Sequence, residues 1–142
     1  MRSTPPGPWA GPPLSAPPDG ARVLWYERSL TGVRAFTATA ARQAGLSPNR
    51  AQDLVIAIAE LAANTLAHTS GPGAVTIWAT SHEVICQVHD QGQITDPMAG
   101  QVRPAPDASG GGRGLWLVRQ VCDDVEIRSD RGGTTVRVHM RR

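Results

Sequence analysis

The chain has 142 residues, 40% of them hydrophobic, which is the size of one domain with one core. Its formal net charge is only +2 and its longest basic run is Arg141 and Arg142, so the composition does not support a nucleic-acid-binding role. All 14 basic residues are arginine, which excludes mechanisms that need a lysine, such as a P-loop or the strand lysine of a protein kinase.

The first 20 residues differ in composition from the rest of the chain. They contain seven of the twelve prolines and few aliphatic side chains, so they bury too little apolar surface to offset the entropy of ordering. We predict a disordered tail over 1–20 and one domain over 21–142. Because this stretch also lacks a long apolar segment, we expect neither a secretion signal nor a membrane anchor, and a cytoplasmic location.

The first half of the domain has the pattern of one strand and two helices. Val23–Glu27 is rich in bulky residues and predicts a short strand. Apolar residues at helical spacing then predict a helix from Ser29, its N-cap, to Gly45. A second helix is predicted from Ser47 to about Thr69, because a cap residue is followed directly by a proline.

The second half is predicted to be mainly strands around a long loop that is rich in Gly, Pro, Ala and Asp. Long loops inside compact domains are usually functional or mobile. We expect two strands, Val75–Thr80 and Val84–His89, followed by the loop over 91–112. A helix, Gly114–Cys122, comes next, and the chain ends in a hairpin of the strands Val125–Arg128 and Thr135–Met140. Helices on one face of a mixed, mainly antiparallel sheet, an α+β two-layer sandwich, would bury this set of elements.

Three polar residues form a stripe along the second predicted helix. Glu60, Asn64 and His68 are spaced at i, i+4 and i+8, with apolar residues around them. At a nucleoside triphosphate, Asn64 can offer an oxygen to Mg²⁺ and Glu60 can orient or deprotonate an attacking hydroxyl. The alternative is a solvated helix face, since charged side chains are mostly exposed.

Two segments have the composition of ligand-binding turns. Asp90 and Gly92 come where a strand ends, so Asp90 can accept a hydrogen bond from an exocyclic amine while Gly92 lets a flat ring approach the backbone. The run from Gly110 to Leu115 opens a helix, where exposed N–H groups and the helix dipole favour an anion. Arg113 either reaches a phosphate or is a solvated loop residue, and Asp and Gly are also common in plain turns.

The last predicted strand begins with Gly133, Thr134, Thr135 and Val136. A threonine hydroxyl there can face a ligand, although β-branched residues are common in strands for other reasons.

Taken in order, these four segments resemble the N, G1, G2 and terminal GT boxes of the GHKL ATPases, over roughly Val23 to Met140. Each box is weak alone, but four in the right order on the expected kinds of element are a specific signal. The short chain, the helix segment ending in Ala67-His68 and the Gly-Arg-Gly-Leu-Trp-Leu-Val segment further resemble the anti-sigma factor serine/threonine kinases and related actinobacterial regulators. The resemblance implies the histidine-kinase-like ATPase, or Bergerat, fold, with ATP and Mg²⁺ as ligands.

The resemblance also implies a role for each matched residue. Glu60 would be the general base that activates a serine hydroxyl of a protein substrate, Asn64 would hold Mg²⁺, and Asp90 would bind the adenine amino group. The residues expected around the nucleotide are, at the base, Gly92 with Thr134 or Thr135 and, along the triphosphate, Gly110, Gly112, Arg113, Gly114 and Leu115. Residues 93–109 would form a lid.

The implied function is that of an ATP-binding anti-sigma factor. It would sequester a sigma factor and phosphorylate a serine of an anti-anti-sigma protein of the STAS type, without direct contact to nucleic acid or membrane; a homodimer is left open. The alternative is a non-catalytic, ATP-dependent protein-binding module of a partner-switching system. Ile94 stands where many family members have a second glycine, so nucleotide binding is a firmer expectation than turnover.

The catalytic domain of a sensor histidine kinase shares the same boxes but fits this chain less well. Such a domain needs a preceding helix that carries a phosphoacceptor histidine. Here the earliest histidine is His68, and a proline-rich stretch that cannot form a long helix precedes Val23.

Overall fold

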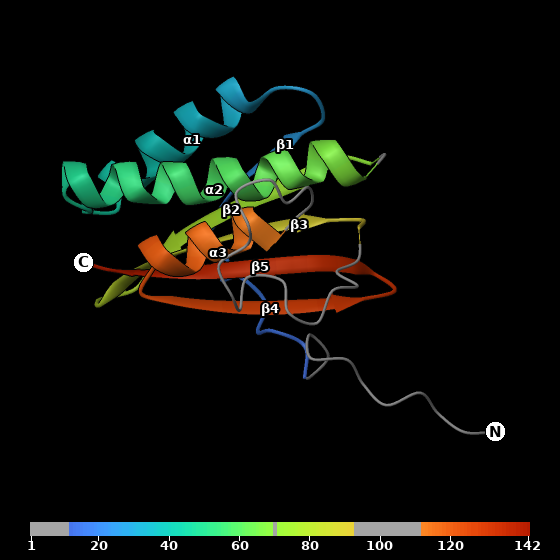
Figure 1. Ribbon diagram of the computed structural model, residues 1–142. Helices are drawn as coiled ribbons and strands as arrows, with labels where there is room; N and C mark the ends of the chain where they lie inside the picture. Colours follow the sequence, from blue (N-terminus) through green and yellow to red (C-terminus); the bar gives the residue numbers. More distant parts are fainter. Residues whose placement is uncertain (1–11, 70, 93–111) are drawn as a thin grey trace.

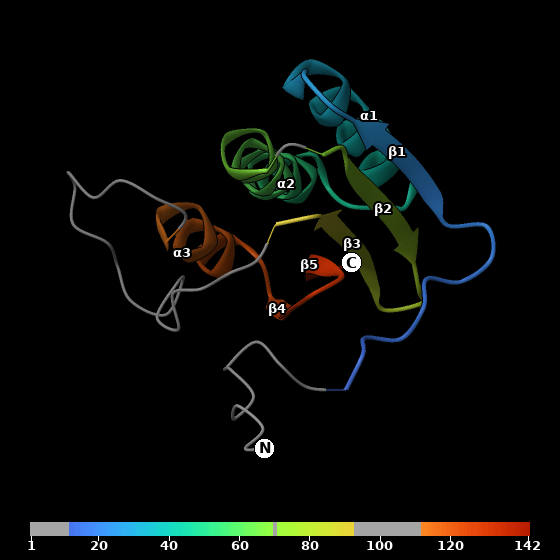
Figure 2. The ribbon, with the colours of Figure 1, turned by 90° about the vertical axis from the view of Figure 1, so that its right-hand side faces the viewer.

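The computed structural model describes residues 12–69, 71–92 and 112–142. In chain order the elements are β1 (Arg22–Tyr26), α1 (Leu30–Gln43), α2 (Pro48–His68), β2 (Gly73–Ala79), β3 (Glu83–Asp90), α3 (Gly112–Val121), β4 (Asp124–Asp130) and β5 (Gly133–Arg141). The strands form one five-stranded sheet in the order β1-β2-β3-β5-β4, and the pairings between these strands are antiparallel. The three helices lie together on one face of the sheet (Figures 1 and 2). The predicted α+β two-layer sandwich is confirmed.

The helix boundaries follow from local capping. Ser29 caps α1 by accepting a hydrogen bond from the backbone N–H of Thr31 at 3.2 Å. Ser47 caps α2 in the same way, accepting from the backbone N–H of Arg50 at 3.3 Å, and Pro48 is the first residue of the helix. Both starts are therefore where the sequence predicts them.

Several strand and helix ends differ from prediction by one or two residues, and in the strands long-range pairing extends the element. Strand β2 begins at Gly73 rather than Val75, because Gly73 pairs with Tyr26 of β1 and the next residue pairs with His89 of β3. Helix α3 begins at Gly112, two residues before the predicted start. The pairing partners of β2 lie too far away in the chain for a local pattern to indicate them.

The core lies between the helices and the sheet. Helix α2 buries Leu54, Ile58 and Leu61, and α3 contributes Val118. The strands add the alternate residues of their inner face, among them Val75, Ile77, Val84, Cys86, Val88, Val136, Val138 and Met140. The period of two along each strand places the remaining side chains on the outer face of the sheet. Within the described ranges, none of the helices combines the length and the hydropathy required of a transmembrane span.

The outer face of the sheet carries polar side chains on β3, β4 and β5, and residues 12–20 run along this face (Figure 2). Arg137 is only 5% exposed there; its guanidinium donates to Gln87 and to both the side chain and the carbonyl oxygen of Ser15, and lies 5.0 Å from the centre of the Trp78 ring. Arg128 donates to the carbonyl oxygen of Pro12 at 2.9 Å. Part of the segment predicted as a tail thus contacts the sheet, while residues 1–11 lie outside the described residues.

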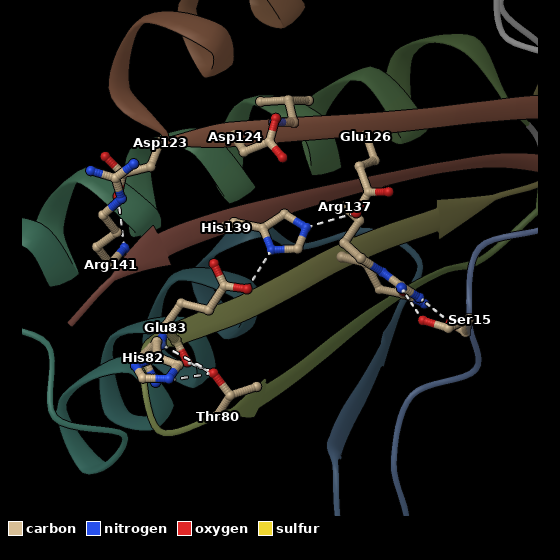
Figure 3. A network of polar contacts seen from close by, with 12 residues as sticks. Ser15, Thr80, His82, Glu83, Asp123, Asp124, Glu126, Arg137, His139 and Arg141 are labelled. Atoms are coloured by element: carbon tan, nitrogen blue, oxygen red, sulfur yellow. Dashed lines mark hydrogen bonds and ion pairs between the residues drawn. The ribbon is translucent and has the colours of Figure 1, made fainter.

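A histidine bridges three strands on the same outer face (Figure 3). His139 of β5 has Nδ1 3.0 Å from Oε1 of Glu83 on β3 and Nε2 2.7 Å from Oε1 of Glu126 on β4. A carboxylate only accepts, so both contacts become hydrogen bonds when both ring nitrogens carry a proton. Burial lowers the pKa of His139, but the hydrogen bonds and negative charges of Glu83 and Glu126 outweigh burial, and the pKa is raised.

We expect the His139→Gln variant to lose more stability at low pH than at high pH. Because the folded-state pKa is raised, the stabilisation by His139 is complete below the unfolded value of about 6.5 and is lost as pH rises through the folded value. Urea unfolding of both proteins between about pH 5 and pH 9 measures this difference. In a Glu83→Gln, Glu126→Gln background the larger loss at low pH should disappear or reverse, because burial alone lowers the pKa of His139. A larger loss at low pH that persists there contradicts the assignment.

Candidate functional site

The predicted catalytic stripe on α2 lies beside the start of α3. A Cβ atom placed on Gly114 would be 3.1 Å from Nδ2 of Asn64 and 3.6 Å from Oε2 of Glu60. The missing side chain at position 114 therefore allows the first turn of α3 to approach both polar groups closely. Glu60 and Asn64 are each half-buried. The side chain of His68, the third member of the stripe, lies outside the described residues.

The start of α3 has the features of an anion site. The helix has ten residues and begins at Gly112, so the N–H groups of its first turn have no partner within the helix and carry the positive end of its dipole. Leu115 is 4% exposed and belongs to the core, which leaves only its backbone for a ligand. Of the other residues predicted here, Gly110 and the side chain of Arg113 lie outside the described residues.

Asp90, at the end of β3, is held by two hydrogen bonds on the helix side of the sheet. The hydroxyl of Thr65 donates to its Oδ2 at 2.8 Å, and the backbone N–H of Gly92 donates to its Oδ1 at 2.8 Å. The phenol of Tyr26 in turn donates to Oγ1 of Thr65 at 2.7 Å. The sequence indicated Asp90 and Gly92 but gave no signal for Thr65 or Tyr26, because these contacts join α2, β1 and β3 in space.

The register of β5 selects one of the two predicted threonines. Thr134 pairs with Asp90, is buried, and donates from its hydroxyl to the carbonyl oxygen of Gly92 at 2.7 Å. Thr135 is the next residue, so its side chain lies on the outer face, where Nδ1 of His89 is 2.8 Å from its hydroxyl. The structure brings Thr134 to Asp90 and does not bring Thr135 there.

Helix α2 joins these two halves of the site. Asn64 faces the start of α3 and its neighbour Thr65 bonds Asp90. Adjacent residues of one helix therefore contact the Asp90 carboxylate at the end of β3 and the N-terminus of α3.

The sequence matches a known protein family. The family of the histidine kinase-like ATPase domain matches residues 26–140, most of the chain. The chain belongs to this family. No curated protein matches the sequence at a significant level.

The fold of this ATPase domain is shared with a solved structure that comprises the RsbU and RsbW domains of Rv1364c from Mycobacterium tuberculosis. The two superpose with a TM-score of 0.60 at 21% sequence identity, over 84% of this chain and 32% of that one. The matched region is thus about a third of that longer chain, and at this identity the similarity concerns the fold.

The residues of the ATPase domain suit Mg²⁺ carried by a ligand better than a metal bound by protein alone. Within the described ranges there is no group of three or more His, Cys, Asp or Glu side chains that could hold a metal ion. Asn64 supplies an amide oxygen of the kind that binds Mg²⁺, and the coordination of Mg²⁺ is commonly completed by substrate phosphates and water. Asn64 therefore fits a magnesium ion that is held mainly by phosphate oxygens next to the N-terminus of α3.

Gly133 is required for the approach of β5 to Asp90, and its replacement tests the geometry. Its φ is +115°, and a Cβ there would lie 2.0 Å from the carbonyl oxygen of Asp90. We expect Gly133→Ala to destabilise the fold by about 2 kcal/mol or more, because left-handed strain and a backbone clash add. Gly132→Ala is the matched control, since within the described ranges a Cβ at Gly132 would meet only a side-chain oxygen of Asp130, at 3.2 Å.

Urea unfolding measures both variants. The control should change stability by only about 0.5 kcal/mol. Equal losses in the two variants would contradict the close approach of Gly133 to Asp90.

Proposed function

We propose that this ATPase domain binds ATP together with Mg²⁺ across α2, α3 and the ends of β3 and β5. One observation carries the proposal: α2 holds the Asp90 carboxylate through Thr65 and, one residue earlier, places Asn64 against the glycine-rich start of α3. The adenine amino group would donate to Asp90, and the triphosphate would lie at the N-terminus of α3.

The remaining predicted contacts extend the same site. Gly92 and Thr134 would border the base, and Gly112, Gly114 and the backbone of Leu115 would face the phosphates. Asn64 would hold Mg²⁺, whose charge offsets the negative charge that the phosphates bring. Gly110, Arg113 and a lid over 93–109 are further parts of the proposal that fall outside the described structure.

We further propose that the domain is a serine kinase of a partner-switching system. Glu60 would take the proton from a serine hydroxyl while the serine oxygen bonds to the γ-phosphorus of ATP and the bond to the bridging oxygen breaks, releasing ADP. The shared fold with a structure that contains an RsbW domain supports this class. The substrate would be an anti-anti-sigma protein of the STAS type, and the sequestered partner would be a sigma factor in the cytoplasm.

Calorimetric titration of ATP with Mg²⁺ tests the nucleotide site. For the wild-type protein we expect a dissociation constant in the micromolar range, which corresponds to a binding free energy of about −8 kcal/mol. Asp90→Asn should lose most of this affinity, because its amide presents a donor toward the adenine amine in place of an acceptor. Absence of binding by the wild-type protein would contradict the proposal, and the domain would then be an interaction module that uses no nucleotide.

The role of Glu60 is tested separately by Glu60→Gln, which keeps the size of the side chain and removes the base. We expect phosphate transfer to a serine-bearing STAS protein to fall by roughly 10²- to 10⁴-fold while ATP affinity stays nearly unchanged. Mass spectrometry of the acceptor protein measures the transfer. If ATP binds but no phosphoserine forms with the wild-type protein, the domain is the non-catalytic module of such a system.

A further inference from the structure

Both oxygens of the Asp90 carboxylate are already engaged by the protein itself. Oδ2 accepts from Thr65 and Oδ1 accepts from the backbone N–H of Gly92, each at 2.8 Å. An ionised carboxylate has about four lone-pair sites, so each oxygen retains room for one further donor. The two bonds fix the rotation of the carboxylate, and with it the direction in which the free lone pairs point.

The two hydrogen bonds that connect Tyr26, Thr65 and Asp90 have a defined donor and acceptor order. Thr65 has a single hydroxyl proton, and its two acceptors are Oδ2 of Asp90 at 2.8 Å and the carbonyl oxygen of Leu61 at 3.5 Å. The shorter, charged acceptor takes the proton. Since Tyr26 lies 2.7 Å from the same hydroxyl oxygen, Tyr26 must be the donor in that contact. The order is therefore Tyr26 to Thr65 to Asp90.

Tyr26 is held rigidly in its place as the first donor. It is 6% exposed, and a Cβ on its strand partner Gly73 would lie 2.4 Å from its ring carbon and hydroxyl oxygen, so the ring fits only because residue 73 is glycine. Burial raises the pKa of Tyr26 to about 12, with the charge of Asp90 adding to the rise and the bond to Thr65 opposing it. The phenol thus keeps its proton throughout the physiological range.

We propose that Tyr26 and Thr65 are positioning residues that fix Asp90 as a pure acceptor and so make the site select a purine with a 6-amino group over one with a 6-oxo group. The inference rests on the proposed nucleotide site, in which Asp90 faces the base. A 6-oxo purine would set an oxygen acceptor against the carboxylate, and the held carboxylate cannot turn to avoid it. Without the two hydroxyls, Asp90 gains rotational freedom and the discrimination falls.

The experiment compares ATP with inosine triphosphate, which differs at the 6-position of the base. Calorimetric titration of each nucleotide with Mg²⁺ is made on the wild-type protein, Tyr26→Phe and Thr65→Val, which remove one hydroxyl each and keep the shape of the side chain. We expect the wild-type protein to favour ATP strongly. Each variant should lose about tenfold in ATP affinity, which corresponds to about 1.4 kcal/mol, while its affinity for inosine triphosphate stays the same or rises.

The control for the substitutions is Thr37→Val in α1. Thr37 is fully buried like Thr65, and among the described residues its hydroxyl has no hydrogen-bond partner. This variant should keep the wild-type preference for ATP. Thermal unfolding of all variants shows that each is folded at the temperature of the titration.

The outcomes separate this inference from the proposed function. If the wild-type protein binds neither nucleotide, the proposed function and the positioning role are both wrong. If it binds ATP and Asp90→Asn loses ATP, but Tyr26→Phe and Thr65→Val keep the wild-type preference, the nucleotide site stands and the positioning role is wrong. Equal losses for ATP and inosine triphosphate would also overturn that role, because they indicate a merely structural effect.

Discussion

Helix α2 buries Leu54 and Ile58 against the sheet, and this contact sets the direction of each site residue on the helix. With 3.6 residues per turn, the side that carries Glu60 and Asn64 then meets α3, while Thr65 meets the end of β3. The apolar face of α2 thereby positions both Asn64 at the start of α3 and Thr65 at the Asp90 carboxylate. A helix of 21 residues packed along its length is a rigid support for groups that must keep a fixed separation.

Glycines near the site serve close packing of the backbone. Gly114 brings the first turn of α3 against Asn64, Gly133 brings β5 against the carbonyl oxygen of Asp90, and Gly73 makes room for Tyr26. In each case a Cβ would meet an atom that belongs to the site or supports it. The same contacts restrict the motion of the polar groups, and groups held in place before a ligand arrives lose little entropy when it binds.

The two faces of the sheet have separate roles because strand side chains alternate. The inner face carries the apolar core and, at the strand ends, Asp90 and Thr134. The outer face carries Arg137 and His139 in a polar network with neighbouring strands and residues 12–20 (Figure 3). Acid–base behaviour of His139 is thus separated from the proposed nucleotide site by the thickness of the sheet.

The kinds of element, their order and the residue types at the site follow from local features of the sequence. Caps such as Ser47 and the apolar periodicities act within a few residues, so they can be interpreted without knowing the fold. The order of the four boxes led to the family that the comparison confirmed over residues 26–140. The lid over 93–109 and the contacts of Gly110 and Arg113 stay predictions.

Which side chains meet depends on how the elements pack. Thr65 reaches Asp90 across 25 residues and Tyr26 reaches Thr65 across 39, and both contacts depend on how α2 and β1 pack rather than on any local pattern. The choice of Thr134 over its neighbour likewise needed the register of β5, since a shift of one residue exchanges the two faces of a strand. Local propensities fix an element, whereas register and packing are set by the whole core at once.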